Sequence, residues 1–171
     1  MTKDILFGPS PEFREIADRV HFLRGKAIGA YAQLEFGLAD ICSQAWEWPE
    51  YHHLKRQFPL KVAARVEEVT KLFKADGPLA KYWKDLEPLL TQLSSYEQNR
   101  HLFAHGHFML SNSNGVPTVH FRIYALRNGG VGLQVENWTL EHLESIASDV
   151  AAYAHRLGRL LGRIYAELRL K

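Results

Sequence analysis

The spacing of apolar residues changes twice along this chain, and these changes constrain the fold more than any other feature. Up to about residue 105, apolar side chains recur every three or four positions, as on one face of an α-helix. From about 107 to 137 they alternate with polar side chains, which is typical of strands with one buried face. The helical spacing then returns. The sequence predicts a mainly α-helical fold, an antiparallel bundle of four to five helices, with a small antiparallel β-meander before the last helix.

Prolines, glycines and capping residues divide the helical part into segments. Ser10 followed by Pro11 indicates a helix start, Gly25 a weak break, and Pro88 the first turn of a further helix. Thr139 is placed to cap the final helix. The predicted helices cover 11–24, 26–46, 59–74, 88–103 and 140–168, with a loop over 47–58 and a short helical piece at 79–86.

Two of these helices carry detailed expectations. The second has a stripe of near seven-residue period, consisting of Ala27, Tyr31, Leu34, Leu38, Ile41 and Ala45. In the third, Val62, Val66, Val69 and Phe73 are expected to face inward, whereas Lys61, Arg65, Glu67, Glu68, Lys71 and Lys74 are expected to face solvent.

Within the alternating segment we expect strands at 108–110, 116–126 and 131–136. The turns fall at 111–115 and at 128–130, where Asn-Gly-Gly is a strong hairpin signal. In the middle strand the inward side chains are Val119, Phe121, Ile123 and Ala125.

Size and composition limit the classes of protein that the chain fits. At 171 residues, with 46% hydrophobic and 23% charged residues, it is expected to form a single domain, 1–171, with the meander as an insertion at about 107–137. Because its single cysteine, Cys42, cannot form an internal disulfide and no long apolar run is present, we expect a cytoplasmic protein that does not enter a membrane. The net charge of +2 does not by itself indicate a nucleic-acid binder.

Arg100 is the residue that most needs an explanation. The helix that begins near Pro88 has the apolar stripe Leu89, Leu93, Tyr96 and Phe103, and Arg100 falls in the middle of it. A buried guanidinium is costly unless it is paired. Glu35, a carboxylate on the flank of the preceding long stripe, is the candidate partner.

Histidines cluster where this helix is expected to end. Gly106 is a helix-ending residue, and His101, His105 and His107 surround it. Arg100 and His105 lie about 140° apart on an ideal helix, so they share a face only if the helix ends between them, as Gly106 leads us to expect. Arg100 can therefore point inward while His105 and His107 lie at the open end.

The segment Asn99-Arg100-His101-Leu102-Phe103-Ala104-His105-Gly106 resembles the Arg-x4-6-His motif of HEPN domains. The resemblance implies a helical bundle that commonly dimerises, and in many members a metal-independent endoribonuclease of toxin or defence systems, with a cognate antitoxin in some cases. It also implies that RNA is the substrate and that no cofactor or metal is needed. An acidic residue on an upstream helix recurs in related families, and Glu35 matches it.

The chemistry of RNA cleavage fits these residue types, because the 2′-hydroxyl of RNA is a built-in nucleophile. We assign His105 as acid or base and Arg100 as the cation that stabilises the phosphate and the transition state. Asn99 and His101 would position the substrate, Glu35 would orient Arg100, and His107 would support the site. The products would carry 2′,3′-cyclic phosphate ends.

Three other interpretations stay open. Arg100 and Glu35 could form a structural ion pair, and the same residues could hold together a non-catalytic HEPN-like interaction or scaffold module. Alternatively, His101, His105 and His107 could bind a metal ion for a hydrolase, although no carboxylate at a suitable spacing completes that set.

Overall fold

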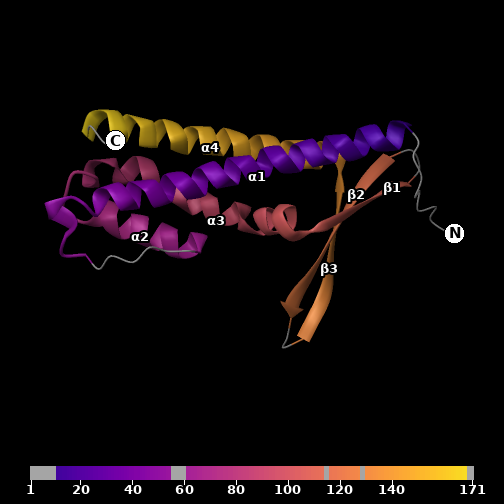
Figure 1. Cartoon of the computed structure of the whole chain (residues 1–171), viewed down its shortest axis with the longest axis horizontal. Helices are drawn as coiled ribbons and strands as arrows, with labels where there is room; N and C mark the ends of the chain where they lie inside the picture. Colours follow the sequence, from indigo (N-terminus) through magenta and orange to yellow (C-terminus); the bar gives the residue numbers. More distant parts are fainter. Residues whose placement is uncertain (1–10, 55–60, 114–115, 128–129, 169–171) are drawn as a thin grey trace. The chain divides into compact units, whose positions relative to one another are not determined.

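The computed structural model describes residues 11–54, 61–113, 116–127 and 130–168 (Figure 1). Within these residues the chain is mainly helical, with a small three-stranded antiparallel sheet before the last helix, as predicted. The elements are α1 (Pro11–Ala45), η1 (Pro49–Tyr51), α2 (Val62–Lys74), η2 (Ala80–Tyr82), α3 (Trp83–His105), β1 (His107–Ser113), β2 (Val116–Arg127), β3 (Gly130–Thr139) and α4 (Leu140–Leu168).

The chain divides into two compact units, which we describe separately. Unit 1 contains residues 1–29 and 98–151, and unit 2 contains residues 30–97 and 152–171. The chain passes from one unit to the other inside α1, α3 and α4. That the whole chain forms a single domain stays a prediction.

The three strands of unit 1 follow the order β1-β2-β3, and both neighbouring pairs are antiparallel. Each strand is longer than predicted, because the pairing continues into the expected turns, with Ser111 opposite Thr118 and Arg127 opposite Gly130. The turn residues 114–115 and 128–129 lie outside the described residues. β1 pairs with β2 only as far as Arg122, so the rest of β2 has β3 as its one partner strand.

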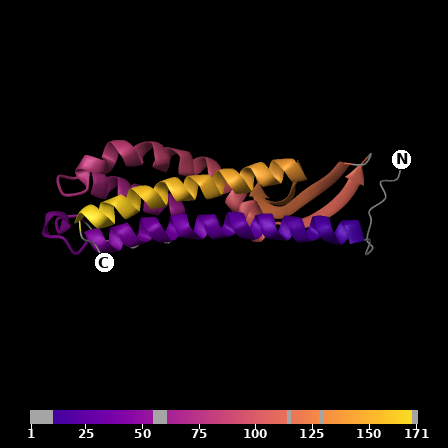
Figure 2. The same cartoon turned by 90° about the horizontal axis from the view of Figure 1, so that it is seen from above.

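One face of this sheet forms the core of unit 1. Val119, Phe121 and Ile123 are buried, which confirms the predicted alternation for these three residues. Aromatic rings dominate the cluster: the Phe121 ring lies 5.0 Å from Trp138 and 5.8 Å from Phe103 at the end of α3. The first half of α1 lies along the same sheet (Figure 2), where the ring of His21 contacts Phe108.

The start of α4 also belongs to unit 1 and begins as predicted. The backbone N–H of His142 donates to the hydroxyl of Thr139 at 3.2 Å, which is the bond that an N-cap residue makes. Leu143, Ile146 and Val150 are buried on its inner face.

Unit 2 is built from helices, and their predicted stripes are buried. In α1, residues Tyr31, Leu34, Leu38, Ile41 and Ala45 are at most 3% exposed. Tyr hydroxyls bind backbone carbonyls across the unit: Tyr31 donates to Tyr96 at 2.7 Å, and Tyr153 donates to Leu89 at 2.6 Å. The other buried apolar side chains of unit 2 include Cys42, Val69, Leu72, Phe73, Leu79, Leu86, Leu90, Leu93, Leu157, Leu160 and Ile164.

The predicted break at Gly25 is wrong, because α1 runs through it without interruption. A glycine inside a helix costs only about 1 kcal/mol relative to alanine. The buried side chains of Leu23 and Ala27 on either side of Gly25 continue one apolar face and offset that cost. The predicted N-cap Ser10 and the predicted helix start at Pro59 lie outside the described residues.

The predicted start of α3 at Pro88 is also wrong. The helix begins at Trp83, and Pro88 lies inside it. Proline has no N–H to donate to the carbonyl four residues earlier, so one helical hydrogen bond is lost. Leu86 and Leu90, which flank Pro88, are buried, and their burial favours a helix that starts one turn earlier.

The predicted solvent exposure of Glu68 is also wrong, because its side chain is buried. It is 4% exposed in α2, between the outward-facing Glu67 and the buried Val69. Its Oε2 accepts a hydrogen bond from Lys71 at 3.1 Å, whereas its Oε1 has no hydrogen-bond partner among the described residues. The inward face of α2 is therefore shifted around the helix axis relative to the face predicted from the valine spacing, and it includes Glu68 as well as Val69.

The described helices include none with a stretch of apolar residues long enough to cross a membrane.

Candidate functional site

The candidate site lies at the C-terminal end of α3, within unit 1. The helix ends before Gly106, the residue expected to end it, but His105 is its last residue. The prediction that the helix ends near Phe103, between Arg100 and His105, is wrong. The N–H of Gly106 donates to the carbonyl of Leu102 at 2.8 Å. A Cβ atom at position 106 would lie 2.5 Å from that carbonyl oxygen. Glycine is therefore required for the chain to turn from helix into strand at this point.

A second contact fixes this helix end. Phe103 is among the last four residues of α3, whose carbonyls have no partner inside the helix. Its carbonyl accepts hydrogen bonds from both Nε and Nη2 of Arg24, the former at 3.1 Å. The Arg24 guanidinium also lies 5.8 Å from the ring centroids of Phe108 and Phe121, and burial lowers its pKa. Arg24 thus joins α1 to the end of α3.

Sequence reasoning missed Arg24, although a signal was present. Arg24 immediately follows Leu23 and lies four residues after Val20, both of which are buried. An arginine at the edge of an apolar stripe can keep its stem among apolar side chains while its head seeks an acceptor. Which acceptor it finds depends on a segment 79 residues away.

Two predicted site residues share one exposed face of α3. The rings of His101 and His105 lie 5.0 Å apart, as expected for positions one helical turn apart, and both side chains are exposed. Their imidazoles are open to a ligand that approaches from solvent.

The third predicted histidine is on the sheet instead. His107 begins β1 and pairs with Arg122 of β2. Leu110 of the same strand faces the core, so the alternation of a strand places His107 on the opposite, outer face. The side chains of His107 and Arg122 are both exposed. Arg122 is a cation beside the predicted site that sequence reasoning assigned only to the outer face of its strand.

Asn99 and Arg100 are half-buried on the last turns of α3. Because the helix continues through His105, Arg100 and His105 stay about 140° apart around its axis, following the 3.6-residue period. The helix of one chain therefore does not present both groups on one face.

Glu35 belongs to unit 2, and its described partner is Arg65. The Arg65 Nη1 lies 3.4 Å from the Glu35 carboxylate and also donates to the Glu35 backbone carbonyl at 3.1 Å. Arg65 was predicted to face solvent, but it is half-buried. The predicted pairing of Glu35 with Arg100, which belongs to unit 1, stays a prediction.

A row of polar side chains crosses the outer face of the sheet. The Asn137 Oδ1 accepts from Nδ1 of His120 at 2.5 Å, which leaves the His120 Nε2 to accept from the hydroxyl of Ser111 at 2.6 Å. Each residue lies on a different strand, so the row joins β1, β2 and β3. Sequence alternation placed His120 on this face, but the pairing register that completes the row could not be predicted.

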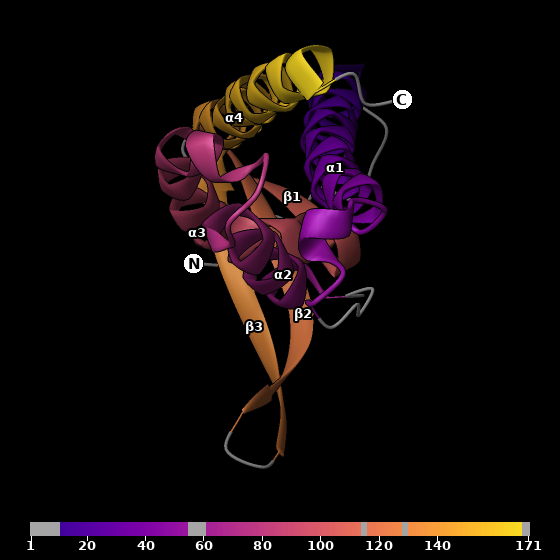
Figure 3. The ribbon, with the colours of Figure 1, turned by 90° about the vertical axis from the view of Figure 1, so that its left-hand side faces the viewer.

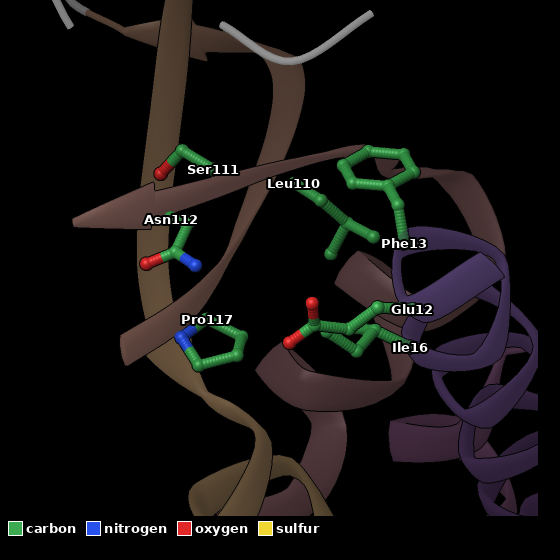
Figure 4. A pocket seen from close by; sticks show the side chains of 7 residues that line it. All are labelled: Glu12, Phe13, Ile16, Leu110, Ser111, Asn112 and Pro117. Carbon is green, nitrogen blue, oxygen red and sulfur yellow. The ribbon is translucent and has the colours of Figure 1, made fainter. Parts of the chain in front are cut away.

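Unit 1 contains a small pocket that none of the predicted site residues lines. A cavity of about 40 Å³ lies between the start of α1 and the sheet, where Phe13 and Leu110 approach each other (Figure 4). The histidines of the site are on the surface, and a substrate would have to bind there.

Among the described residues, no group of three or more His, Cys, Asp or Glu side chains is arranged to hold a metal ion. His101, His105 and His107 therefore do not form the ligand set that the metal-dependent alternative requires.

Comparison of the chain with models of protein families, with curated proteins and with solved structures finds no match.

Proposed function

We propose that this protein is a metal-independent endoribonuclease of HEPN type, a toxin or defence effector that cleaves RNA to 2′,3′-cyclic phosphate ends. The observation that carries the proposal is the exposed His105 on the last turn of α3, with the imidazole of His101 5.0 Å from its own. Arg100 lies in the same two turns, in the order and spacing of the motif that the segment resembles.

In this proposal the 2′-oxygen of the RNA attacks the adjacent phosphorus, and the 5′-oxygen of the next nucleotide leaves. His105 transfers a proton to or from one of these oxygens, a role that histidine fills well near neutral pH. Arg100 donates hydrogen bonds to the phosphate oxygens as charge develops. His101 and Asn99 position the scissile nucleotide, and His107 supports the site from the sheet.

The separation of Arg100 and His105 around α3 has a consequence for the active form. If one chain cannot direct both side chains at one phosphate, a second copy must complete the site. Arg100 of one copy would then act with His105 of the other. A shared site can be distinguished from a site within one chain, because only a shared site allows two inactive variants to restore activity when they are mixed.

The first experiment measures cleavage of a mixed-sequence RNA by purified protein in the presence of a chelator. Arg100→Ala and His105→Ala should each reduce the rate by about 100-fold to 10,000-fold, the range that acid–base groups contribute. His155→Ala, at an exposed histidine of α4, serves as the matched control and should leave the rate unchanged. Full activity of both site variants would contradict the proposal.

The second experiment mixes the two inactive variants. If the site is shared between copies, a heterodimer of Arg100→Ala and His105→Ala chains retains one intact site, and part of the activity returns. No recovery in a mixture shown to exchange subunits would mean that each chain uses its own Arg100 and His105.

A non-catalytic interaction module is the second candidate, and the same separation of Arg100 and His105 favours it. In that case the wild-type protein would not cleave RNA under any of these conditions, with or without a divalent metal ion.

A further inference from the structure

The outer face of the sheet changes character between its base and its end. At the base this face carries polar side chains, including His120, Arg122 and Asn137. Beyond Arg122 the same face is apolar. We call the residues 123–127 and 130–135 the arm, and Figure 3 shows this part of β2 and β3 extending past the rest of the sheet.

The pairing register brings the exposed apolar side chains of the arm together. Tyr124 lies opposite Leu133, and Leu126 lies opposite Val131, while Val135 lies opposite Arg122 at the base. The five side chains are all exposed: Tyr124 by 73%, Leu126 by 83%, Val131 by 72%, Leu133 by 42% and Val135 by 44%. A solvated sheet face normally carries polar residues, so this surface is built for contact with something else.

The arm also lacks the features that protect a sheet from association. It is a two-stranded ribbon, because β1 ends its pairing at Arg122. Isolated two-stranded ribbons are marginally stable in water, and exposed edges usually carry charges or proline. Neither Ile123–Leu126 nor Val131–Val135 contains a charged residue or a proline.

We propose that the arm is a dimerisation surface on which a second copy of this chain packs, apolar face against apolar face, about a twofold axis. The five side chains expose on the order of 500 Å², a size at which patches on monomers are often functional. Two copies would bury roughly 1,000 Å² in total, which reaches the lower limit of a specific interface.

The distribution of charge favours a second copy over a different protein. Apart from Arg127 at the end of β2, the arm offers no charged group to select a complementary partner, whereas a twofold interface requires only that the same patch meet itself. With the two arms antiparallel, the rung of Tyr124 and Leu133 lies at the axis. The two Arg122 side chains then lie at opposite ends of the interface and do not repel each other.

The test is the mass of the full chain in solution, measured by sedimentation over a concentration series. The wild-type protein should be a dimer at micromolar concentrations. Leu133→Glu and Leu133→Lys should each weaken dimerisation by at least about 100-fold, because like charges meet at the axis. An equimolar mixture of the two variants should dimerise again, which a different partner protein could not explain.

Two controls keep the result specific. Phe36→Glu places a charge at another strongly exposed apolar side chain, 72% exposed on α1, and should not alter the dimer. Circular dichroism should show that the Leu133 variants stay folded. A monomeric wild-type protein at 100 μM, on the order of a hundred times the concentration a micromolar interface needs, would overturn the proposal. A Leu133→Glu variant that remains a dimer would overturn it as well.

A cross-linking experiment gives an independent measurement. The native Cys42 is 0% exposed and does not compete for oxidation. Leu133→Cys should form a disulfide-linked dimer under mild oxidation, whereas Phe36→Cys should not. These results do not depend on RNA cleavage, so the arm proposal and the proposed ribonuclease activity can fail separately.

Discussion

The two units use their polar side chains in different ways. In unit 2 tyrosine hydroxyls form hydrogen bonds that connect helices: Tyr31 and Tyr153 donate to backbone carbonyls, and Tyr165 donates to Asp40 at 2.6 Å. In unit 1 the histidines at the end of α3 are exposed and adjoin one another. Polar groups in unit 2 therefore hold helices in place, whereas the histidines at the end of α3 are open to solvent.

This difference predicts that the two units respond to different perturbations. Changes to buried polar groups of unit 2 should alter stability, whereas changes at the exposed end of α3 should alter activity with little effect on stability.

Alkaline pH should destabilise unit 2 more than unit 1. Burial raises the pKa of the Cys42 thiol to about 12, and it raises the pKa values of the Tyr153 and Tyr165 hydroxyls well above their ordinary range. The folded state keeps these protons where the unfolded state releases them. Their contribution to the unfolding free energy is fully present below the ordinary pKa values and is lost as pH rises from about 9 towards 12. The loss is about 1.4 kcal/mol per pH unit for each of the buried Cys42 and Tyr153, and it is smaller for the half-buried Tyr165, which solvent screens.

Hydrogen exchange resolved by segment, at pH 8 and pH 10.5, would measure how much protection each unit loses at alkaline pH. Six of the seven tyrosines belong to unit 2, and the exception, Tyr124, is 73% exposed. Cys42→Ala should make the unfolding free energy less dependent on pH above 9. Equal loss of protection in both units would contradict the prediction.

Arg24 is a polar side chain of unit 1 that stabilises structure. Arg24→Met keeps an apolar stem beside Phe108 and Phe121 but removes both hydrogen bonds to the Phe103 carbonyl. Leaving a buried acceptor unpaired costs about 1–3 kcal/mol. We expect that loss in urea unfolding, together with reduced RNA cleavage because the end of α3 is no longer fixed.

The matched control is Arg14→Met, at an exposed arginine of the same helix. It should change stability by less than about 0.5 kcal/mol. If Arg24→Met and Arg14→Met unfold at the same urea concentration, the Arg24 contact does not stabilise the helix end.

Periodicity and capping signals made most of the fold predictable. The stripe from Tyr31 to Ala45, the inward residues Val119 and Phe121, and the cap at Thr139 follow from spacing within one element. Such local rules need no knowledge of what the element packs against. They also predicted that Gly106 ends α3, but not that the helix continues through His105.

The partners of polar side chains could not be predicted, since they depend on how elements far apart in sequence are rotated and aligned. Arg24 binds a carbonyl 79 residues away, and Arg65 takes the carboxylate of Glu35 from a different helix. Spacing alone also could not decide which charged residue of α2 faces inward, because Glu68 adjoins the inward-facing Val69. The site is therefore less predictable than the fold around it.

Substitution of Glu68 in α2 should have a small effect on stability. It is a buried carboxylate with one oxygen on Lys71 and one without a donor among the described residues. Removing a carboxylate from water costs free energy that an incomplete set of hydrogen bonds does not recover, and a well-packed apolar residue is often at least as stable. Glu68→Met should therefore raise the unfolding free energy by up to about 1 kcal/mol, whereas the exposed Glu67→Met should leave it unchanged. A loss of more than about 2 kcal/mol in Glu68→Met would show that the carboxylate stabilises unit 2 through its charge, with Arg65 and Lys71 as the cations to test next.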